Sequence, residues 1–311
     1  MACPISLFLL LSLSSFLRAG KAESISQCEV ELLQFALNLE YLETEFFLSG
    51  ALGHGLDIVA PDLARGGSPP IGGQKANLGF FVRDIIIQFA YQEVGHLREI
   101  QQMVGGFPRP LMDLSSTNFA KIMTKAMGAP LHPPFDPYLN DINFLLASYL
   151  IPYVGLTAYV GTMPYLNSTS IKRLVASLLA VKSGQDAVIR SLLYRHALQP
   201  IYPYTSNVAE LTNRLSALRN RLSRSSNKDQ GLLVSPHGWI GGSSSGNIIY
   251  SNNNSIAYWR FPRETLRILY GTGHEDRPGG FFPIGTKGAV AQIYLANATS
   301  ACPRLSKNNN H

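Results

Sequence analysis

Apolar residues recur every three or four positions in four long segments of the chain, which is the spacing of a helix with a buried face. In the first segment Val30, Leu33, Leu37 and Tyr41 fall on one such face, and Gly50 follows as a stop signal. The pattern therefore predicts four long helices. They cover residues 26–49, about 77–104, about 141–162, and the stretch from "NSTS" (167–170) to about 198.

Local signals mark the ends of these helices. A Gly-Gly pair at 105–106 ends the second one, since glycine readily takes the backbone conformation that follows a helix. Ser168 or Ser170 can cap the start of the fourth helix with its hydroxyl group. Pro152 lies inside the third helix and can bend it, because proline lacks the N–H that a helix interior needs.

The connection between the second and third helices is long. It spans residues 107–140 and holds one short predicted helix near 116–127, whereas a Gly/Pro-rich loop at 51–76 joins the first two helices. Connections of this length are uncommon inside compact domains. A long crossover lets the chain travel the length of a bundle, so that the second and third helices run parallel. The sequence therefore predicts a mainly α fold, a four-helix bundle with a long crossover.

The character of the sequence changes after Gln199. "PIYPYT" breaks the helical pattern, a fifth helix is expected at about 206–224, and "PRETLRILYGTG" (262–273) holds one short helix. The remaining stretches are rich in Gly, Ser, Asn and Pro, which favours loops with short strands. We therefore expect a bundle at residues 25–200 and a C-terminal extension at 201–311 that packs on it.

Composition and charge narrow the function. An apolar fraction of 46% with 15% charged residues indicates a globular protein, and the formal net charge is only +6. The densest basic run, "RLSALRNRLSR" (214–224), has no interleaved aromatic residues. An amphipathic surface helix explains this run better than a nucleic-acid interface, so no nucleic-acid partner is expected.

The first residues predict secretion. "PISLFLLLSLSSFL" (4–17) is apolar but too short to span a bilayer, and Gly20 and Ala22 suit cleavage after Ala22. Residues 1–22 are therefore expected to be a signal peptide of a secreted protein. The other long apolar stretch, 142–163, contains Pro152 and many small or polar residues, which favours a buried helix over a membrane span. The chain is not expected to be an integral membrane protein.

Cysteines and sequons fit the same compartment. Cys28 and Cys302 could join the two ends of the mature chain in one disulfide, or could remain two free thiols. The sequence also holds three Asn-x-Ser/Thr sequons, the acceptor motif for N-glycosylation. They begin at Asn167, Asn253 and Asn297.

Acidic residues and one histidine on the first two helices could bind a metal. A dinuclear site in a helix bundle takes one Glu from each of two helices and a Glu-x-x-His motif from each of the other two. The second helix carries Glu93 and His96 in that motif, and the first offers Glu40 and Glu43 three residues apart, a spacing that places two side chains on one face. We expect Glu45 to point away from this face into solvent.

The other two helices supply little. Between Asp141 and Asp186 the sequence has no Asp or Glu, and the fourth helix places Lys182 where the motif would begin, followed by Gln185. Two interpretations stay open. Iron or manganese could bind at an incomplete site to which Gln185 or Asp186 contributes, or Lys182 could neutralise the buried carboxylates in place of a metal. The sequence names no cofactor beyond these two metals.

Several segments together resemble plant desiccation-related proteins of the ferritin-like superfamily, over about residues 25–295. They are "FALNLEYLETEFFLSGALGHGLD", "FAYQEVGHLREI", "NFLLASYLIPYVGLTAYVGT", "LVASLLAVKSGQDAVIRSLLY" and "PRETLRILYGTG…RPGGFFP". The resemblance implies a ferritin-like four-helix bundle, an extracellular location in the apoplast or cell wall, and accumulation during drying. By position it places Glu40, Glu93 with His96, and Gln185 with Asp186 in the carboxylate motifs of the family.

The chain departs from the family pattern at Lys182, where the family looks to have Glu in a "Glu-Ser-Gly-Gln-Asp" string. The change removes one carboxylate and adds a positive charge. We therefore expect a secreted, stress-protective and non-catalytic protein, with a metal-binding oxidoreductase as the alternative. Its partners could be cell-wall components or further copies of the chain.

Overall fold

The computed structural model describes residues 24–234 and 247–302. The predicted signal peptide lies outside these residues. The described part is mainly helical and confirms the predicted fold class. Its α-helices are α1 (Gln27–Leu52), α2 (Leu56–Val59), α3 (Pro61–Ala64), α4 (Phe80–Val104), α5 (Ser116–Met127), α6 (Asp141–Ser148), α7 (Pro152–Thr162), α8 (Thr169–Arg195), α9 (Val208–Ser223), α10 (Pro262–Leu269) and α11 (Ala289–Leu295).

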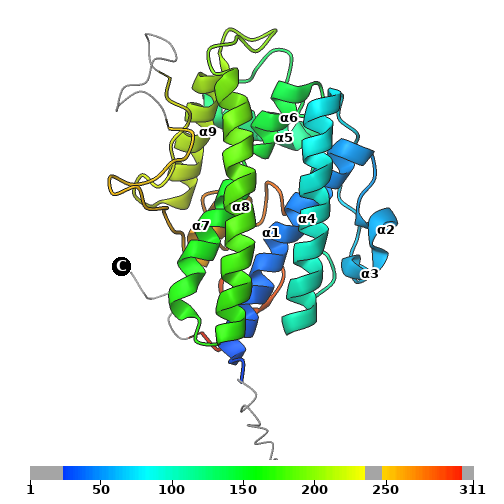
Figure 1. The fold of residues 1–311 in the computed structure, drawn as a ribbon, viewed down its shortest axis with the longest axis vertical. Coiled ribbons are helices and arrows are strands. Elements are labelled where there is room, and N and C mark those ends of the chain that lie inside the picture. The colour runs from blue at the N-terminus through cyan, green and yellow to red at the C-terminus, as the bar shows by residue number, and fades with distance from the viewer. Residues whose placement is uncertain (1–23, 235–246, 303–311) are drawn as a thin grey trace, which may run out of the picture.

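The bundle is formed by α1, α4, the α6–α7 segment and α8 (Figure 1). α1 and α4 run antiparallel to each other, α6 and α7 follow the direction of α4, and α8 returns antiparallel to α7. α1 packs on both α4 and α7, and α7 packs on α8. The long crossover carries the chain from the end of α4 back to the end of the bundle where α6 begins, so the second and third helices are parallel as predicted.

α1 is the central helix. Every residue from Phe35 to Ala51 is buried, as expected of a helix that is surrounded by others. A capping box at its start joins Ser26 and Glu29, and Gly53 closes its end in the left-handed conformation. Because α1 is enclosed, each polar side chain on it needs a partner inside the protein.

The third predicted helix is two helices. α6 ends at Ser148 and α7 begins at Pro152, which occupies the first turn, where its missing N–H costs nothing. The stretch Asp141–Tyr165 is long and apolar enough to cross a membrane, but 89% of its most apolar window is buried inside the protein. It is therefore packed as a core segment of the bundle.

The crossover also fixes the loop at residues 51–76. Arg109 donates to the carboxylates of Glu45 and Asp57, and it is buried with Glu45. The expectation that Glu45 is solvated was wrong, because Glu45 has no exposed surface. The local helix pattern could not show this pairing, since the arginine comes from a segment 64 residues further along the chain.

The described residues after Gln199 lie against the bundle as loops and three helices. α9 packs on α5, α10 packs on α7 and α9, and α11 packs on α1. The expected short strands do not occur in the described residues of this region, and α11 was not expected. The reason is that backbone groups there bond to neighbouring loops and helices instead of to a partner strand. Phe281, for example, donates to the carbonyl of Leu269.

Cys28 and Cys302 form a disulfide that links α1 to the last described residue. The Cα atoms are 4.8 Å apart, and the bond closes a separation of 274 residues. Glu31 holds the same end of the chain by accepting hydrogen bonds from Ser300 and Ala301. The three sequon asparagines, Asn167, Asn253 and Asn297, are all exposed.

Candidate functional site

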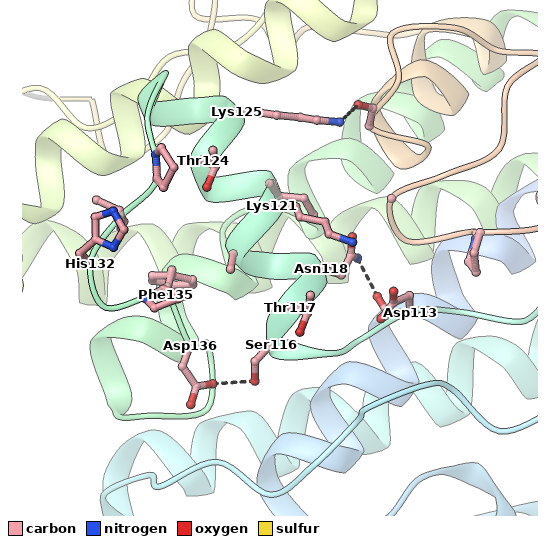
Figure 2. A pocket seen from close by; sticks show the side chains of 18 residues that line it. Asp113, Ser116, Thr117, Asn118, Lys121, Thr124, Lys125, His132, Phe135 and Asp136 are labelled. Atoms are coloured by element: carbon pink, nitrogen blue, oxygen red, sulfur yellow. Dashed lines mark hydrogen bonds between the residues drawn. The ribbon is translucent and has the colours of Figure 1, made fainter.

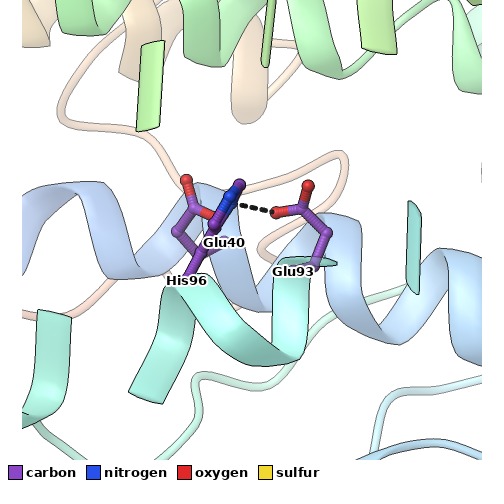
Figure 3. A group of neighbouring side chains, drawn as sticks. All are labelled: Glu40, Glu93 and His96. Carbon is purple, nitrogen blue, oxygen red and sulfur yellow. Dashed lines mark hydrogen bonds and ion pairs between the residues drawn. The ribbon is translucent and has the colours of Figure 1, made fainter. Parts of the chain in front are cut away.

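A group of acidic and basic side chains meets in the centre of the bundle. α1 supplies Glu40 and Glu43, and α4 supplies Glu93 and His96. Figure 3 shows Glu40, Glu93 and His96 pointing toward one another across the α1–α4 interface. The three-residue spacing on each helix places both of its side chains on the face that the other helix covers.

The histidine bridges two carboxylates. His96 Nδ1 lies 3.1 Å from Glu40 Oε2 and 3.3 Å from Glu93 Oε2. One ligand atom from each of Glu40, Glu93 and His96 lies within 4.8 Å of the others, so this buried Glu-Glu-His group could hold a metal ion. The carboxylates are fully buried and His96 retains 8% of its surface.

Lys182 of α8 lies among the same carboxylates. Its Nζ is 3.0 Å from Glu40 Oε2 and 2.9 Å from Glu43 Oε2, and it also contacts Glu93 Oε2. Lys182 has no exposed surface. The ammonium group thus bonds to three carboxylates from two helices, which is the position that a shared metal ion would need.

Lys182, Glu40, Glu43 and Glu93 form a lysine–carboxylate cluster. Two of its three carboxyl Oε1 atoms accept hydrogen bonds, and one does not. Tyr159 donates to Glu40 Oε1 over 2.7 Å, and Gln185 Nε2 donates to Glu93 Oε1 over 2.7 Å. Glu43 Oε1 is buried and accepts no hydrogen bond from the described residues. Gly155 of α7 lies against this oxygen, and a Cβ atom there would come within 3.1 Å of it.

Burial and neighbouring charges set the protonation of the cluster. Burial opposes a charge on His96, but the hydrogen bonds to Glu40 and Glu93 outweigh it and raise the pKa of His96 to about 10. Burial would likewise raise the pKa of Glu40, yet Lys182 and His96 lower it well below its usual range. The carboxylates raise the pKa of Lys182 despite its burial. Both basic groups are therefore cations at neutral pH.

Glu43 behaves differently. Burial is the largest of the effects that together raise the pKa of Glu43 to about 8. Lys182 lowers this pKa, whereas Glu93 and Glu40 raise it. At neutral pH Glu43 is therefore largely protonated. Lys182 and His96 then both lie against Glu40 and Glu93, so each of these two side chains has two cations beside it.

The side chains present do not fit a dinuclear metal site. α7 contributes Tyr159, whose pKa burial and the Glu40 carboxylate raise well above 10, so it remains a neutral phenol. α8 contributes the Lys182 ammonium and the Gln185 amide instead of a carboxylate and a histidine. Because the ammonium already bonds to Glu40, Glu43 and Glu93, a cation would have to displace it.

The structure separates Asp186 from this cluster. Asp186 is buried near Arg190, Arg219 and Asp229, and burial raises its pKa to about 6 against the effect of the two arginines. Gln185, the preceding residue, faces Glu93. Of the six candidate metal ligands, the structure brings together Glu40, Glu43, Glu93, His96 and Gln185.

Asp186 lies near a second group of buried charges, which the sequence did not predict. Arg219 of α9 pairs with Asp229, and Arg260 lies 3.6 Å from the same carboxylate. The arginine-rich run at 214–224 lies on an amphipathic helix as predicted, but the buried position of Arg219 was not expected. A signal was present, because Leu211, Leu215 and Leu218 are spaced so that Arg219 shares their buried face.

Comparisons with known proteins agree with the helical-bundle fold. A family model described as a ferritin-like domain matches residues 28–195. The ferritin-like catalase Nec2 of Nesocodon mauritianus is 51% identical over 271 residues, which are 87% of each chain. The desiccation-related protein PCC13-62 of Craterostigma plantagineum is 51% identical over 284 residues, which are 91% of each chain. No solved structure matches significantly. The chain belongs to the ferritin-like family, among relatives that include a desiccation-related protein.

Proposed function

We propose that this protein is a secreted, non-catalytic stress-protective protein, in which an internal ion cluster stands where a metal centre would otherwise lie. The observation that carries the proposal is the contact of Lys182 with Glu40, Glu43 and Glu93. A relative of similar length is named a desiccation-related protein, which supports a role in drying tissue.

The cluster gives the bundle a permanent counter-charge. Burying a carboxylate without a partner costs several kcal/mol. The Lys182 ammonium supplies the partner here, and because it is part of the chain it cannot dissociate as a metal ion can. A scaffold of this kind stays neutral in its core whether or not iron or manganese is available. Independence from metal supply suits a protein that must remain folded while water and solutes change greatly.

Secretion is part of the proposal. The predicted signal peptide, the Cys28–Cys302 disulfide and the three exposed sequon asparagines support it together, because disulfides and N-glycans both form in the secretory pathway. In this setting cell-wall components or further copies of the chain are the partners that we propose.

The test begins with the mature protein made in a eukaryotic secretory host. After incubation with iron or manganese and removal of free metal, we expect far less than one metal ion per chain and no decomposition of hydrogen peroxide. We also expect the protein to preserve the activity of a reporter enzyme through drying, better than an equal mass of serum albumin. Metal at one or more ions per chain, lost in a Glu93→Ala/His96→Ala variant, would overturn the non-catalytic assignment.

A metal-dependent peroxide-decomposing enzyme is the second candidate. It is favoured by the relative named a ferritin-like catalase and by the convergence of Glu40, Glu93 and His96. This function requires Lys182 to leave the carboxylates when metal enters. Peroxide decomposition that rises with added manganese or iron and disappears in His96→Ala would establish it.

A further inference from the structure

A groove on the outer surface of α5 shares no residue with the lysine–carboxylate cluster. It has a volume of about 790 Å³, within the range of small-molecule binding sites. Figure 2 shows α5 as its floor, with the loop that carries His132 and Asp136 on one side. Gly271, Gly280 and Pro283 of the C-terminal region complete the lining. Two regions that are distant in sequence, residues 113–136 and 271–283, therefore build it.

The floor offers hydrogen-bonding groups that the protein does not use. Thr117, Lys121 and Thr124 follow one another at helical spacing along α5 and line the groove. Within the described chain, none of these three side chains makes a hydrogen bond or ion pair. Lys125, one position beyond Thr124, is instead committed to the carbonyl of Gly271 at 2.8 Å.

Two carboxylates near the start of α5 are each held in place by hydrogen bonds to one of their two oxygen atoms. Asp113 Oδ1 accepts from the N–H and the hydroxyl of Ser115, and Asp136 Oδ1 accepts from the Ser116 hydroxyl and the Tyr138 N–H. The other oxygen of each carboxylate accepts no hydrogen bond from any described residue. These oxygens are therefore fixed acceptors that a ligand can reach without a cost for ordering them.

Apolar rings and side chains stand beside the polar floor. Pro130, Leu131 and Pro134 line the groove in the loop after α5, and Pro283 lines it in the C-terminal region. Such surfaces contact C–H groups well but offer no side-chain hydrogen bonds. The groove thus suits a ligand that has both apolar C–H faces and a rim of hydroxyl groups.

The charges that line the groove restrict the chemical class of the ligand further. The lysines Lys121 and Lys125 balance the carboxylates Asp113 and Asp136, so the lining does not select strongly for a charged molecule. A phosphate would meet one uncommitted lysine and two carboxylates, which repel it. We propose that this groove binds a neutral saccharide, whose ring faces contact the apolar walls and whose hydroxyls bond to Thr117, Lys121 and the free carboxylate oxygens.

The experiment uses the full mature chain with its disulfide intact. Sucrose, raffinose, cellotriose and xylotriose are titrated into the protein and followed by calorimetry and by ligand-observed NMR. Inorganic phosphate and glycine betaine serve as probes of the anionic and zwitterionic classes. We expect at least one of the four saccharides to bind with a Kd in the millimolar range or below, and neither phosphate nor betaine to compete with it.

A double variant locates the binding. Thr117→Val/Lys121→Met removes two groups that make no hydrogen bond or ion pair within the described chain, so the fold should be unaffected and saccharide affinity should fall about tenfold or more. Lys172→Met, an exposed lysine on α8, is the matched control and should bind as the unmodified protein does. Circular dichroism and the Tm report folding for both variants.

Three outcomes would overturn the proposal. The first is no binding of any of the four saccharides at tens of millimolar. The second is binding that Thr117→Val/Lys121→Met leaves unchanged although the variant is folded. The third is binding of phosphate or betaine that the same variant abolishes, which would assign the groove to a different ligand class.

Discussion

Lys182 Nζ lies 2.9 Å from Glu43 Oε2, so an ammonium on α8 and a carboxyl on α1 meet with no solvent between them. Glu43 also has a buried oxygen that accepts no hydrogen bond from the described residues, and it is the cluster carboxyl whose pKa is raised. The lysine therefore contacts three acidic side chains, and their charges are balanced only with the help of the His96 cation and the proton on Glu43. This dependence makes the cluster sensitive to substitution and to pH.

Removing the lysine charge should destabilise the protein strongly. Lys182→Met keeps the length and apolar stem of the side chain but leaves Glu40, Glu43 and Glu93 without their shared cation. Removing one partner of a buried ion pair typically costs about 3–5 kcal/mol of stability. Chemical denaturation should show a loss of this size, whereas Lys172→Met should stay within about 0.5 kcal/mol of the unmodified protein. A loss below about 1 kcal/mol would contradict the structural role of Lys182.

Placing a carboxylate at this position should create a metal site. In Lys182→Glu the ammonium is gone and four acidic side chains surround the space beside His96. Four carboxyl groups cannot all ionise there without a cation, so manganese or iron should bind and raise the Tm. Elemental analysis and thermal melts with and without metal check this outcome. The unmodified protein and Lys182→Glu/His96→Ala are the controls, and equal metal content in all three would refute the expectation.

Stability should fall as the pH rises from about 5 to 10. The folded-state pKa values of Glu43, about 8, and His96, about 10, lie above their usual values of 4.5 and 6.5. In this window the folded state binds more protons than the unfolded state, so folding is favoured at the acidic end. Urea unfolding at pH 5.5 and pH 8 measures the slope. Glu43→Gln should flatten it, and an unchanged slope would show that Glu43 is not the titrating group.

Reduction of the Cys28–Cys302 disulfide should lower stability without changing the fold. The bond closes nearly the whole described chain, and removing a native disulfide costs about 2–5 kcal/mol. A Cys28→Ser/Cys302→Ser variant should show this loss in denaturation experiments and no further effect of added reductant. The unmodified protein should lose a similar amount with reductant. Its failure to respond would contradict a stabilising role for the bond.

Much of the fold could be predicted from the sequence, because it depends on local signals. The helical spacing of apolar residues, the Ser168 cap and the length of the crossover all reflect interactions within a short stretch of chain. The break at Pro152 follows from the chemistry of one residue. These features are therefore visible without knowledge of any tertiary contact.

The candidate site could be predicted only in part. The three-residue spacing of Glu93 and His96 shows that they share a face, but it does not show what lies opposite. Gln185 and Asp186 are neighbours in sequence, yet they point into different buried clusters. The partner of Glu45, Arg109, comes from the crossover. Such pairings depend on how distant segments meet, which composition and periodicity do not encode.

The interruption between α6 and α7 has a consequence for how the molecule unfolds. Tyr149, inside that interruption, accepts a hydrogen bond from Arg219 at its carbonyl and a second one from Arg190 at its hydroxyl. One residue of the bundle is thus tied both to α9 and, through Arg190, to the loop at Asn247 and Ile248. The bundle cannot open at this point without releasing the C-terminal region. Heating should therefore melt both parts in a single cooperative transition.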